Sequence, residues 1–307
     1  MTPNVSVLLP VYNAEPYLAK AVESILDQTY ENFELLALDD GCLDNSLAVL
    51  RHYAKSDRRI TVLSRENRGI VQTLNQLVGL ARGQFLARMD ADDLSFPRRF
   101  EKQIQFLDAN PTCVLVGGCV ELIDDQDRPI GILNFPLSHE EIDECHLRGH
   151  TSIWHPTVVY RKAAIDRIGG YKDSYSAAED LDLWLRLAEL GRIANIPEVI
   201  LRYRLHENSV SEANGEQQRQ AARRACESAW QRRGIHRKFD ANVHWRPGTD
   251  RRSQHDFSLR YAWMAWSAGN NATWWAYARK ALRLRPFAIA SWKVIIFGFL
   301  RRAPRQK

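Results

Sequence analysis

Three carboxylates lie within four residues at Asp90-Ala91-Asp92-Asp93, directly after the apolar run of residues 83–89. Hard oxygen ligands clustered where a strand ends are what a divalent cation and a diphosphate require. The same residues could instead form an acidic turn that caps the next helix. If the first interpretation holds, the protein binds a nucleotide whose phosphates are neutralised by Mg²⁺ or Mn²⁺.

The elements around this cluster bear on that choice. Short apolar runs at residues 5–9, 35–38 and 60–63 predict buried strands, and segments with helical spacing lie between them. Asn13 stands where the N-cap of the first helix is expected. Alternating strands and helices of this length predict an α/β fold with a mainly parallel central sheet and right-handed crossovers.

A second acidic pair, Asp39-Asp40, follows the run at 35–38, so two carboxylate clusters end two strands of one predicted sheet. Ligands bind at the carboxyl ends of such strands. Asp40 could accept the imide N–H of a base, and Tyr12 offers a stacking face. Asp90 and Asp92 could reach a ribose hydroxyl and a metal. Because the sequence has neither a dinucleotide-binding glycine motif nor a P-loop, the cation would hold the phosphates.

Seven motifs in order carry a resemblance that spans roughly residues 4–211. They are VSVLLPVYN at 5–13, SILDQTY at 24–30, DDG at 39–41, ENRG at 66–69, DADD at 90–93, HPT at 155–157 and EDLDLWLR at 179–186. This order resembles the family 2 glycosyltransferases, the inverting group with the GT-A fold. The resemblance implies a Rossmann-like nucleotide-binding domain, a nucleotide-sugar donor, a divalent metal ion, and transfer of the sugar with inversion at its anomeric carbon.

Site roles follow from the resemblance position by position. Asp40 would contact the base, Asp90 the ribose, and Asp92 the metal and the diphosphate, with uridine diphosphate as the default nucleotide. Further contacts to the nucleotide sugar are implied at Pro10, Tyr12, Asn13, Arg68 and Arg204.

Asp180 would be the catalytic base, and its chemistry can also be argued from the residues. An acceptor hydroxyl must lose its proton as it attacks the anomeric carbon. The least that this reaction needs is a carboxylate within hydrogen-bond distance of the hydroxyl. Asp180 precedes a segment with helical spacing that ends near Gly191. A helix N-terminus should keep this carboxylate ionised near neutral pH. The alternatives are that Asp180 is only an N-cap, or that the adjacent Glu179 substitutes for it or orients the acceptor.

Two further segments have both a functional and a structural interpretation. Trp154 and His155 would line the acceptor side of the cleft by resemblance, although a histidine beside a tryptophan also suits a packed core. Arg204 and His206 belong to a segment that resembles one in the family where cationic groups could bind the leaving diphosphate. His206 could also complete the metal shell. That segment could equally be a solvated loop.

Cys42 is a departure from the family pattern, which usually has serine after Asp-Asp-Gly. A thiol is a poorer hydrogen-bond donor than a hydroxyl, so we expect the turn that supports Asp40 to be held differently. The carboxylates themselves remain.

Composition and cysteine content fit a globular protein of the cytoplasm. The chain has 307 residues, 45% hydrophobic content and five scattered cysteines, and no secretory signal is recognised at its start. No apolar run reaches the length that a bilayer span needs.

The charge is distributed unevenly along the chain. Residues 1–215 carry 22 basic and 32 acidic side chains, whereas residues 216–307 carry 20 basic and 5 acidic ones together with seven tryptophans. Arginine and lysine interleaved with large aromatic and aliphatic side chains favour an anionic membrane surface over nucleic acid as a partner. A helical hairpin is expected at 257–284, resembling a single tetratricopeptide-like unit that packs on the body or contacts a membrane.

These observations predict a catalytic domain at residues 1–212 and a basic, tryptophan-rich helical extension at 213–307. The favoured function is metal-assisted transfer of a sugar from a nucleotide-diphosphate sugar to a glycan or lipid-linked acceptor, at the cytoplasmic face of a membrane. The alternative is a protein that binds nucleotide sugars without turnover and docks partners through its basic tail. A nucleotidyltransferase would need a glycine-rich loop after the first strand, and residues 10–13 do not provide one.

Overall fold

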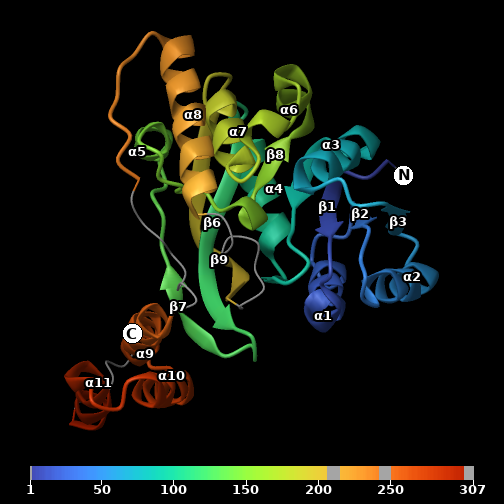
Figure 1. Ribbon diagram of the computed structural model, residues 1–307. Coiled ribbons are helices and arrows are strands. Elements are labelled where there is room, and N and C mark those ends of the chain that lie inside the picture. The colour runs from blue at the N-terminus through green and yellow to red at the C-terminus, as the bar shows by residue number, and fades with distance from the viewer. Residues whose placement is uncertain (1, 206–214, 242–249, 301–307) are drawn as a thin grey trace. The chain divides into compact units, whose positions relative to one another are not determined.

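The computed structural model describes residues 2–205, 215–241 and 250–300, which form two compact units (Figure 1). Unit 1 consists of Met1–Val120, Asn134–Arg202 and Glu216–Ala241. Unit 2 consists of Glu121–Leu133, Tyr203–Gly215 and Asn242–Lys307.

The first half of unit 1 is a parallel sheet in the order β3-β2-β1-β4. The four strands are β1 (Val5–Val11), β2 (Phe33–Asp40), β3 (Ile60–Arg65) and β4 (Phe85–Arg88). Apolar side chains on both faces of β1 and β2 are buried, as covered parallel strands require. The register places Val11 opposite Asp39 and Leu8 opposite Arg88, so the carboxyl ends of β1, β2 and β4 meet at one edge.

Three helices connect these parallel strands. They are α1 (Glu15–Leu26), α2 (Ser46–Ser56) and α3 (Ile70–Leu80). Figure 1 shows α1 and α2 on one side of the sheet and α3 on the other, as right-handed crossovers demand when the strand order reverses after β3. The predicted alternation of strands and helices is therefore confirmed.

The predicted N-cap at Asn13 is wrong. Helix α1 begins at Glu15 after Ala14, and no side chain caps it. Asn13 adopts a left-handed backbone conformation with φ of 48°, and its side-chain oxygen instead accepts a hydrogen bond from the Leu43 amide at 2.8 Å.

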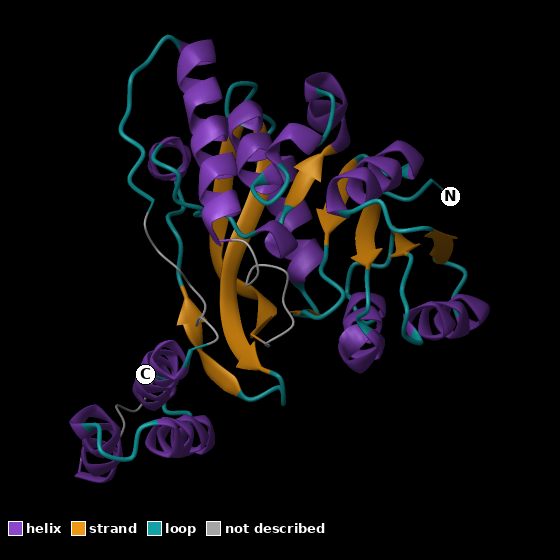
Figure 2. Cartoon of the chain, viewed as in Figure 1, coloured by secondary structure: helices purple, strands orange, loops and turns teal. Residues whose placement is uncertain are grey.

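The sheet continues beyond β4 with antiparallel neighbours. Their order is β8 (Val159–Arg161), β6 (Cys113–Asp124), β9 (Arg192–Leu205) and the short β5 (Leu94–Ser95), and β7 (Pro129–Leu133) pairs with β6. The pairs of β8 with β4 and β6, and of β5 with β9, are antiparallel. The sheet is thus mixed, with its parallel strands at the end that carries the acidic clusters (Figure 2).

Five helices complete unit 1. They are α4 (Arg99–Ala109), α5 (His139–Leu147), α6 (Lys162–Ile168), α7 (Glu179–Leu187) and α8 (Gly215–Arg233). One face of α7 buries Leu183, Trp184 and Leu187 in the main core, which also contains residues of β1, β2, β4 and α3. This packing fixes the N-terminus of α7.

The compact units divide the chain differently from the predicted domains 1–212 and 213–307. Helix α8 belongs to unit 1 because its evenly spaced Ala221, Ala225 and Ala229 are buried against α5 and α7. Conversely, Glu121–Leu133 belongs to unit 2, since β7 and the adjoining end of β6 lie in that stretch.

The helical part of unit 2 contains α9 (Arg251–Ser267), α10 (Asn271–Leu284) and α11 (Ile289–Leu300). Asp250 caps α9 by accepting hydrogen bonds from the Arg252 and Ser253 amides. The predicted hairpin of α9 and α10 is confirmed, although α9 begins six residues before residue 257. Of the helices that the structure describes, none is long and apolar enough to cross a membrane.

Candidate functional site

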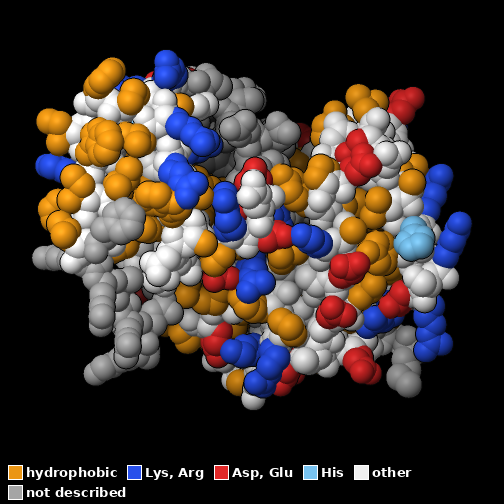
Figure 3. Space-filling view, turned by 90° about the horizontal axis from the view of Figure 1, so that it is seen from below, with side chains coloured by type: hydrophobic (Ala, Val, Ile, Leu, Met, Phe, Trp, Pro, Cys, Tyr) orange, Lys and Arg blue, Asp and Glu red, His pale blue; other side chains and the backbone are white. Residues whose placement is uncertain are grey.

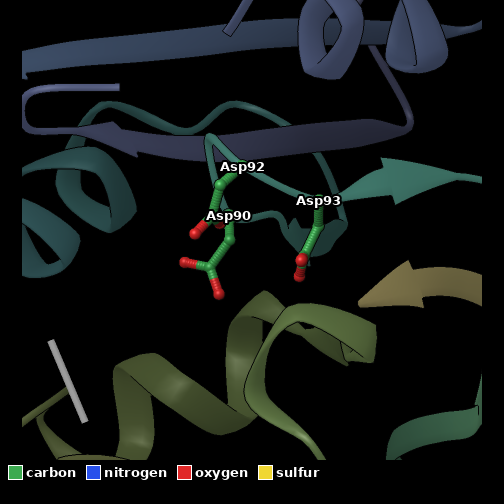
Figure 4. A group of neighbouring side chains, drawn as sticks. All are labelled: Asp90, Asp92 and Asp93. Atoms are coloured by element: carbon green, nitrogen blue, oxygen red, sulfur yellow. The ribbon is translucent and has the colours of Figure 1, made fainter. Parts of the chain in front are cut away.

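The turn after β4 gathers the three carboxylates singled out in the sequence. One oxygen from each of Asp90, Asp92 and Asp93 can be chosen so that all three lie within 4.8 Å of one another. Figure 4 shows the three side chains projecting to the same side of the turn. A set of hard carboxylate oxygens this close together fits a divalent cation such as Mg²⁺ or Mn²⁺. Asp93, which belongs to the predicted cluster but had no separate role, is therefore a candidate ligand beside Asp92.

Arg88, the last residue of β4, is a second feature that the sequence reasoning missed. Its guanidinium is buried and forms an ion pair with Asp90. Burial by itself lowers the pKa of Arg88, but the nearby carboxylates of Asp90 and Asp93 outweigh it and raise the pKa above its ordinary value. A cation at the end of a buried apolar strand was the signal that could have revealed it.

Glu179 and Asp180 lie in the first turn of α7, where both side chains are half-buried. Burial, followed by the negative charge of Asp180, raises the pKa of Glu179 to about 7. Burial also raises the pKa of Asp180, although the Leu181 amide, which donates to its Oδ1 at 2.7 Å, and Arg88 both oppose the rise. The helix N-terminus therefore does not hold the pKa of Asp180 at its ordinary value, because desolvation is the larger effect, and ionisation of this carboxylate near neutral pH stays a prediction.

His155 sits in a packed aromatic cluster. Its Nε2 lies 2.8 Å from the hydroxyl of Tyr171, which lies 3.2 Å from the hydroxyl of Tyr160. Its ring meets Trp184 edge to face at 5.6 Å. Burial, and then the charge of Arg88, lower the pKa of His155 well below its ordinary value, so the imidazole is neutral at physiological pH. Its neighbour Trp154 packs against Phe135 at 5.5 Å.

Asp40 occupies the carboxyl end of β2 and is buried. Its carboxylate accepts hydrogen bonds from the amides of Arg68 and Gly69 at 3.1 and 2.8 Å and pairs with Arg65 at 2.9 Å. Asp40 therefore anchors the loop after β3 and draws it toward the end of β2. The side chain of Arg68 is exposed on that loop.

Tyr12 follows β1, with half of its side chain exposed. The turn that carries it is fastened by Cys42. The Sγ of Cys42 accepts a hydrogen bond from the Asn13 amide at 3.2 Å and donates to the Val11 carbonyl at 3.6 Å. Burial and the neighbouring Asp39 raise the pKa of Cys42 to about 12, so it remains a thiol able to donate. Cys42 thus both accepts and donates a hydrogen bond in this turn.

The last two predicted site residues lie in a segment assigned to unit 2. Arg204 on β9 is buried, and its Nη1 lies 3.0 Å from the Asp124 carbonyl oxygen and 2.5 Å from Oδ1 of Asp127. These contacts are within unit 2. His206 lies outside the described residues.

The sequence matches the family described as Glycosyl transferase family 2 over residues 6–169. An uncharacterized glycosyltransferase of Haemophilus influenzae is 33% identical over 238 residues, covering 72% of this chain and 72% of the relative. The O-antigen biosynthesis glycosyltransferase WbnJ of Escherichia coli is 33% identical over 214 residues, covering 68% of this chain and 82% of the relative. The amylovoran biosynthesis glycosyltransferase AmsE of Erwinia amylovora is also 33% identical over 214 residues, covering 68% of this chain and 79% of the relative.

Solved structures share the fold at lower identity. The mannosyltransferase PcManGT from Pyrobaculum calidifontis, in complex with GDP-Man and Mn²⁺, superposes with a TM-score of 0.59 at 17% identity, covering 98% of this chain and 80% of that one. TarS 1–349 of S. aureus, in complex with UDP-GlcNAc, gives a TM-score of 0.60 at 16% identity, covering 91% and 81%. These likenesses confirm the predicted GT-A fold. The chain belongs to glycosyl transferase family 2 and is a glycosyltransferase.

Proposed function

We propose that the chain is an inverting glycosyltransferase that moves a sugar from a nucleotide-diphosphate sugar, UDP-linked by resemblance, to a hydroxyl of a glycan or lipid-linked acceptor. The observation that carries this proposal is electrostatic. Arg88 pairs with Asp90 and lowers the pKa of both Glu179 and Asp180, and Asp90 in turn raises the pKa of Asp180. The donor turn and the candidate base therefore act on each other within unit 1.

The donor side would consist of the strand ends around the acidic turn. Asp40 and the loop that it holds would meet the base, with Arg68 and the turn of Pro10, Tyr12 and Asn13 beside it. Asp90 would meet the ribose. Asp92, helped by Asp93, would hold Mg²⁺ or Mn²⁺, which when bound neutralises charge on the diphosphate. Arg204 would contact the diphosphate, and His206 would contact the metal.

Asp180 would act as the base in a single displacement. The acceptor oxygen forms the new bond to the anomeric carbon as its proton passes to the Asp180 carboxylate, and the bond from that carbon to the diphosphate oxygen breaks. A carboxylate with a raised pKa is a stronger proton acceptor, which suits this task. Glu179, half-buried beside it, would orient the acceptor, and Trp154 and His155 would line the acceptor side.

The names of the relatives support a glycan acceptor, since WbnJ is named for O-antigen and AmsE for amylovoran biosynthesis. The fold neighbours hold different nucleotides, GDP-Man in one and UDP-GlcNAc in the other. We propose that transfer takes place at the inner face of the cell membrane, where a lipid-linked acceptor would be reached.

Isothermal titration with a panel of nucleoside diphosphates, with and without Mn²⁺, tests the donor site. We expect metal-dependent binding of one diphosphate that is lost in Asp92→Ala and kept in Asp108→Ala, an exposed carboxylate on α4. Asp180→Asn should bind the donor normally and lose transfer to an acceptor. Failure of every diphosphate to bind would overturn the donor assignment, whereas binding without any measurable turnover would favour the non-catalytic alternative.

A further inference from the structure

The outward face of α11 is apolar to an unusual degree. Of the eleven large hydrophobic side chains that are exposed in the described residues, six lie in the fourteen residues from 287 to 300. They are Phe287, Ile289, Trp292, Ile296, Phe297 and Leu300. Three of them are largely exposed to solvent, Phe287 by 96%, Leu300 by 74% and Ile289 by 73%. We call these six side chains the α11 face.

The opposite side of α11 is firmly packed, so the α11 face cannot turn inward without breaking unit 2. Val294 is fully buried among residues of α9 and α10. The buried Ser291 has its Oγ 2.8 Å from Nε2 of His255 on α9 and donates to the Arg285 carbonyl at 3.1 Å. A Cβ added to Gly298 would lie 1.9 Å from the ring of Trp274 on α10, which shows how closely the two helices approach.

Positive charge accompanies the α11 face. Residues 250–300 contain eight lysines and arginines but only two acidic residues, and the sequence continues with four more cations. Arg283 and Arg285 at the end of α10 are exposed, as is Lys293 within α11. Figure 3 shows hydrophobic side chains gathered at the left of the molecule with lysine and arginine side chains beside them.

We propose that the α11 face binds the surface of an anionic lipid bilayer, with the helix lying in the interface. A helix of twelve residues is about 18 Å long, roughly half of what a bilayer span needs, so it would lie flat and bury its apolar side chains below the headgroups. Trp292 suits that depth, and Lys293, Arg283 and Arg285 would reach lipid phosphates.

The charge pattern favours lipid over a second copy of the chain. A twofold contact through the α11 face would bring the same set of cations on both copies close together, and like charges across an interface are repulsive. Nucleic acid would satisfy the cations but leave six apolar side chains against phosphates. An anionic bilayer accepts both components of the surface.

Vesicle sedimentation of the full-length chain tests the proposal. Vesicles of phosphatidylcholine mixed with phosphatidylglycerol should bind the protein at low salt, and pure phosphatidylcholine vesicles should bind it more weakly. The triple variant Phe287→Ser/Ile289→Ser/Leu300→Ser should lower the partition coefficient about ten-fold or more. The matched control Leu80→Ser removes a partly exposed leucine from α3 and should bind as the native chain does. Arg283→Gln/Arg285→Gln should selectively lose the preference for anionic vesicles.

Several results would overturn the proposal. They are equal binding by the triple variant, absence of binding to anionic vesicles at low salt, or a native dimer that the triple variant converts to monomer in light scattering. Because the three replaced side chains are mostly exposed, the variant should fold, and an unchanged circular dichroism spectrum checks this. The inference stands apart from the proposed transfer reaction, since Asp92→Ala should still bind vesicles even if no donor is ever found.

Discussion

A buried arginine among carboxylates is the residue on which the electrostatics of the site depends. Arg88 pairs with Asp90, and its charge lowers the pKa of Glu179 and Asp180 while burial raises them. Replacing Arg88 by methionine removes that charge and keeps much of the volume. The two carboxylates of α7 would then be still harder to ionise.

We therefore predict that Arg88→Met lowers transfer near neutral pH and moves the acidic limb of the pH–rate profile upward by about one unit. The shift is upward because the base must be ionised and its pKa rises when the cation is lost. Arg88→Lys should recover part of the shift, and Arg82→Met, which removes the partner of Glu34 elsewhere in unit 1, should leave the profile in place. A profile that only falls in height would assign Arg88 a purely structural role.

Glu179 carries a second prediction, on stability. Burial and Asp180 raise the pKa of Glu179 to about 7 in the folded chain, above its ordinary value of 4.5. Between these two pKa values the folded state therefore keeps a proton that the unfolded state has released. The contribution of this proton to the free energy of unfolding is fully present below pH 4.5 and is lost as the pH rises through about 7. Above that pH, the ionised Glu179 destabilises the folded state.

Glu179→Gln should remove this destabilisation, because glutamine does not ionise. Relative to the native chain, its free energy of unfolding should rise by about 1–3 kcal/mol at pH 8 and change little near pH 4. Urea unfolding at a series of pH values measures the difference. The exposed Glu31→Gln is the matched control and should show no such pH dependence. A constant difference at all pH values would mean that Glu179 is ionised normally in the folded state.

At the scale of elements, close packing of α10 on α11 makes a glycine essential. Gly298→Val would place atoms inside the ring of Trp274, so we expect unit 2 to lose about 1–3 kcal/mol and the amides of α10 and α11 to exchange faster. Gly79→Ala in α3 is the contrasting control, because nothing lies within 4 Å of the added Cβ, and it should be neutral or slightly stabilising. Unchanged exchange in Gly298→Val would show that the two helices can separate at little cost.

Elements with a local signal were predictable from the sequence. The apolar runs of β1 to β4 and the evenly spaced alanines of α8 follow from periodicity and burial, and the acidic turn was identified because it follows such a run. Arg88 was missed because its role comes from tertiary neighbours, Glu179 and Asp180 on α7. The N-cap at Asn13 failed for a similar reason, since the turn is set by contacts with Cys42 and Leu43, about thirty residues away. The assignment of Glu121–Leu133 to unit 2 likewise depends on contacts between β7 and the distant helices α9 and α10.

At the scale of the whole molecule, the proposed donor contacts other than Arg204 and His206 fall in unit 1, whereas the proposed lipid-binding surface falls in unit 2. The acidic turn, Asp40 and α7 belong to unit 1, whereas α9 to α11 belong to unit 2. A ligand stabilises what it binds by RT ln(1 + [L]/Kd), or about 2.7 kcal/mol at one hundred times Kd. The two ligands should therefore protect different parts of the chain.

Hydrogen exchange with each ligand tests this division. With a nucleoside diphosphate and Mn²⁺, amides of β1, β4 and the first turn of α7 should exchange up to about 100-fold more slowly at one hundred times Kd, while those of α10 and α11 stay as they were. Anionic vesicles should slow α11 and leave β1 and β4 unchanged. Slower exchange at the end of β9 with the nucleotide would support the assignment of Arg204 to the donor. If the nucleotide slowed exchange in α10 as much as in β1 and β4, the division would be contradicted, because donor binding would then stabilise both units.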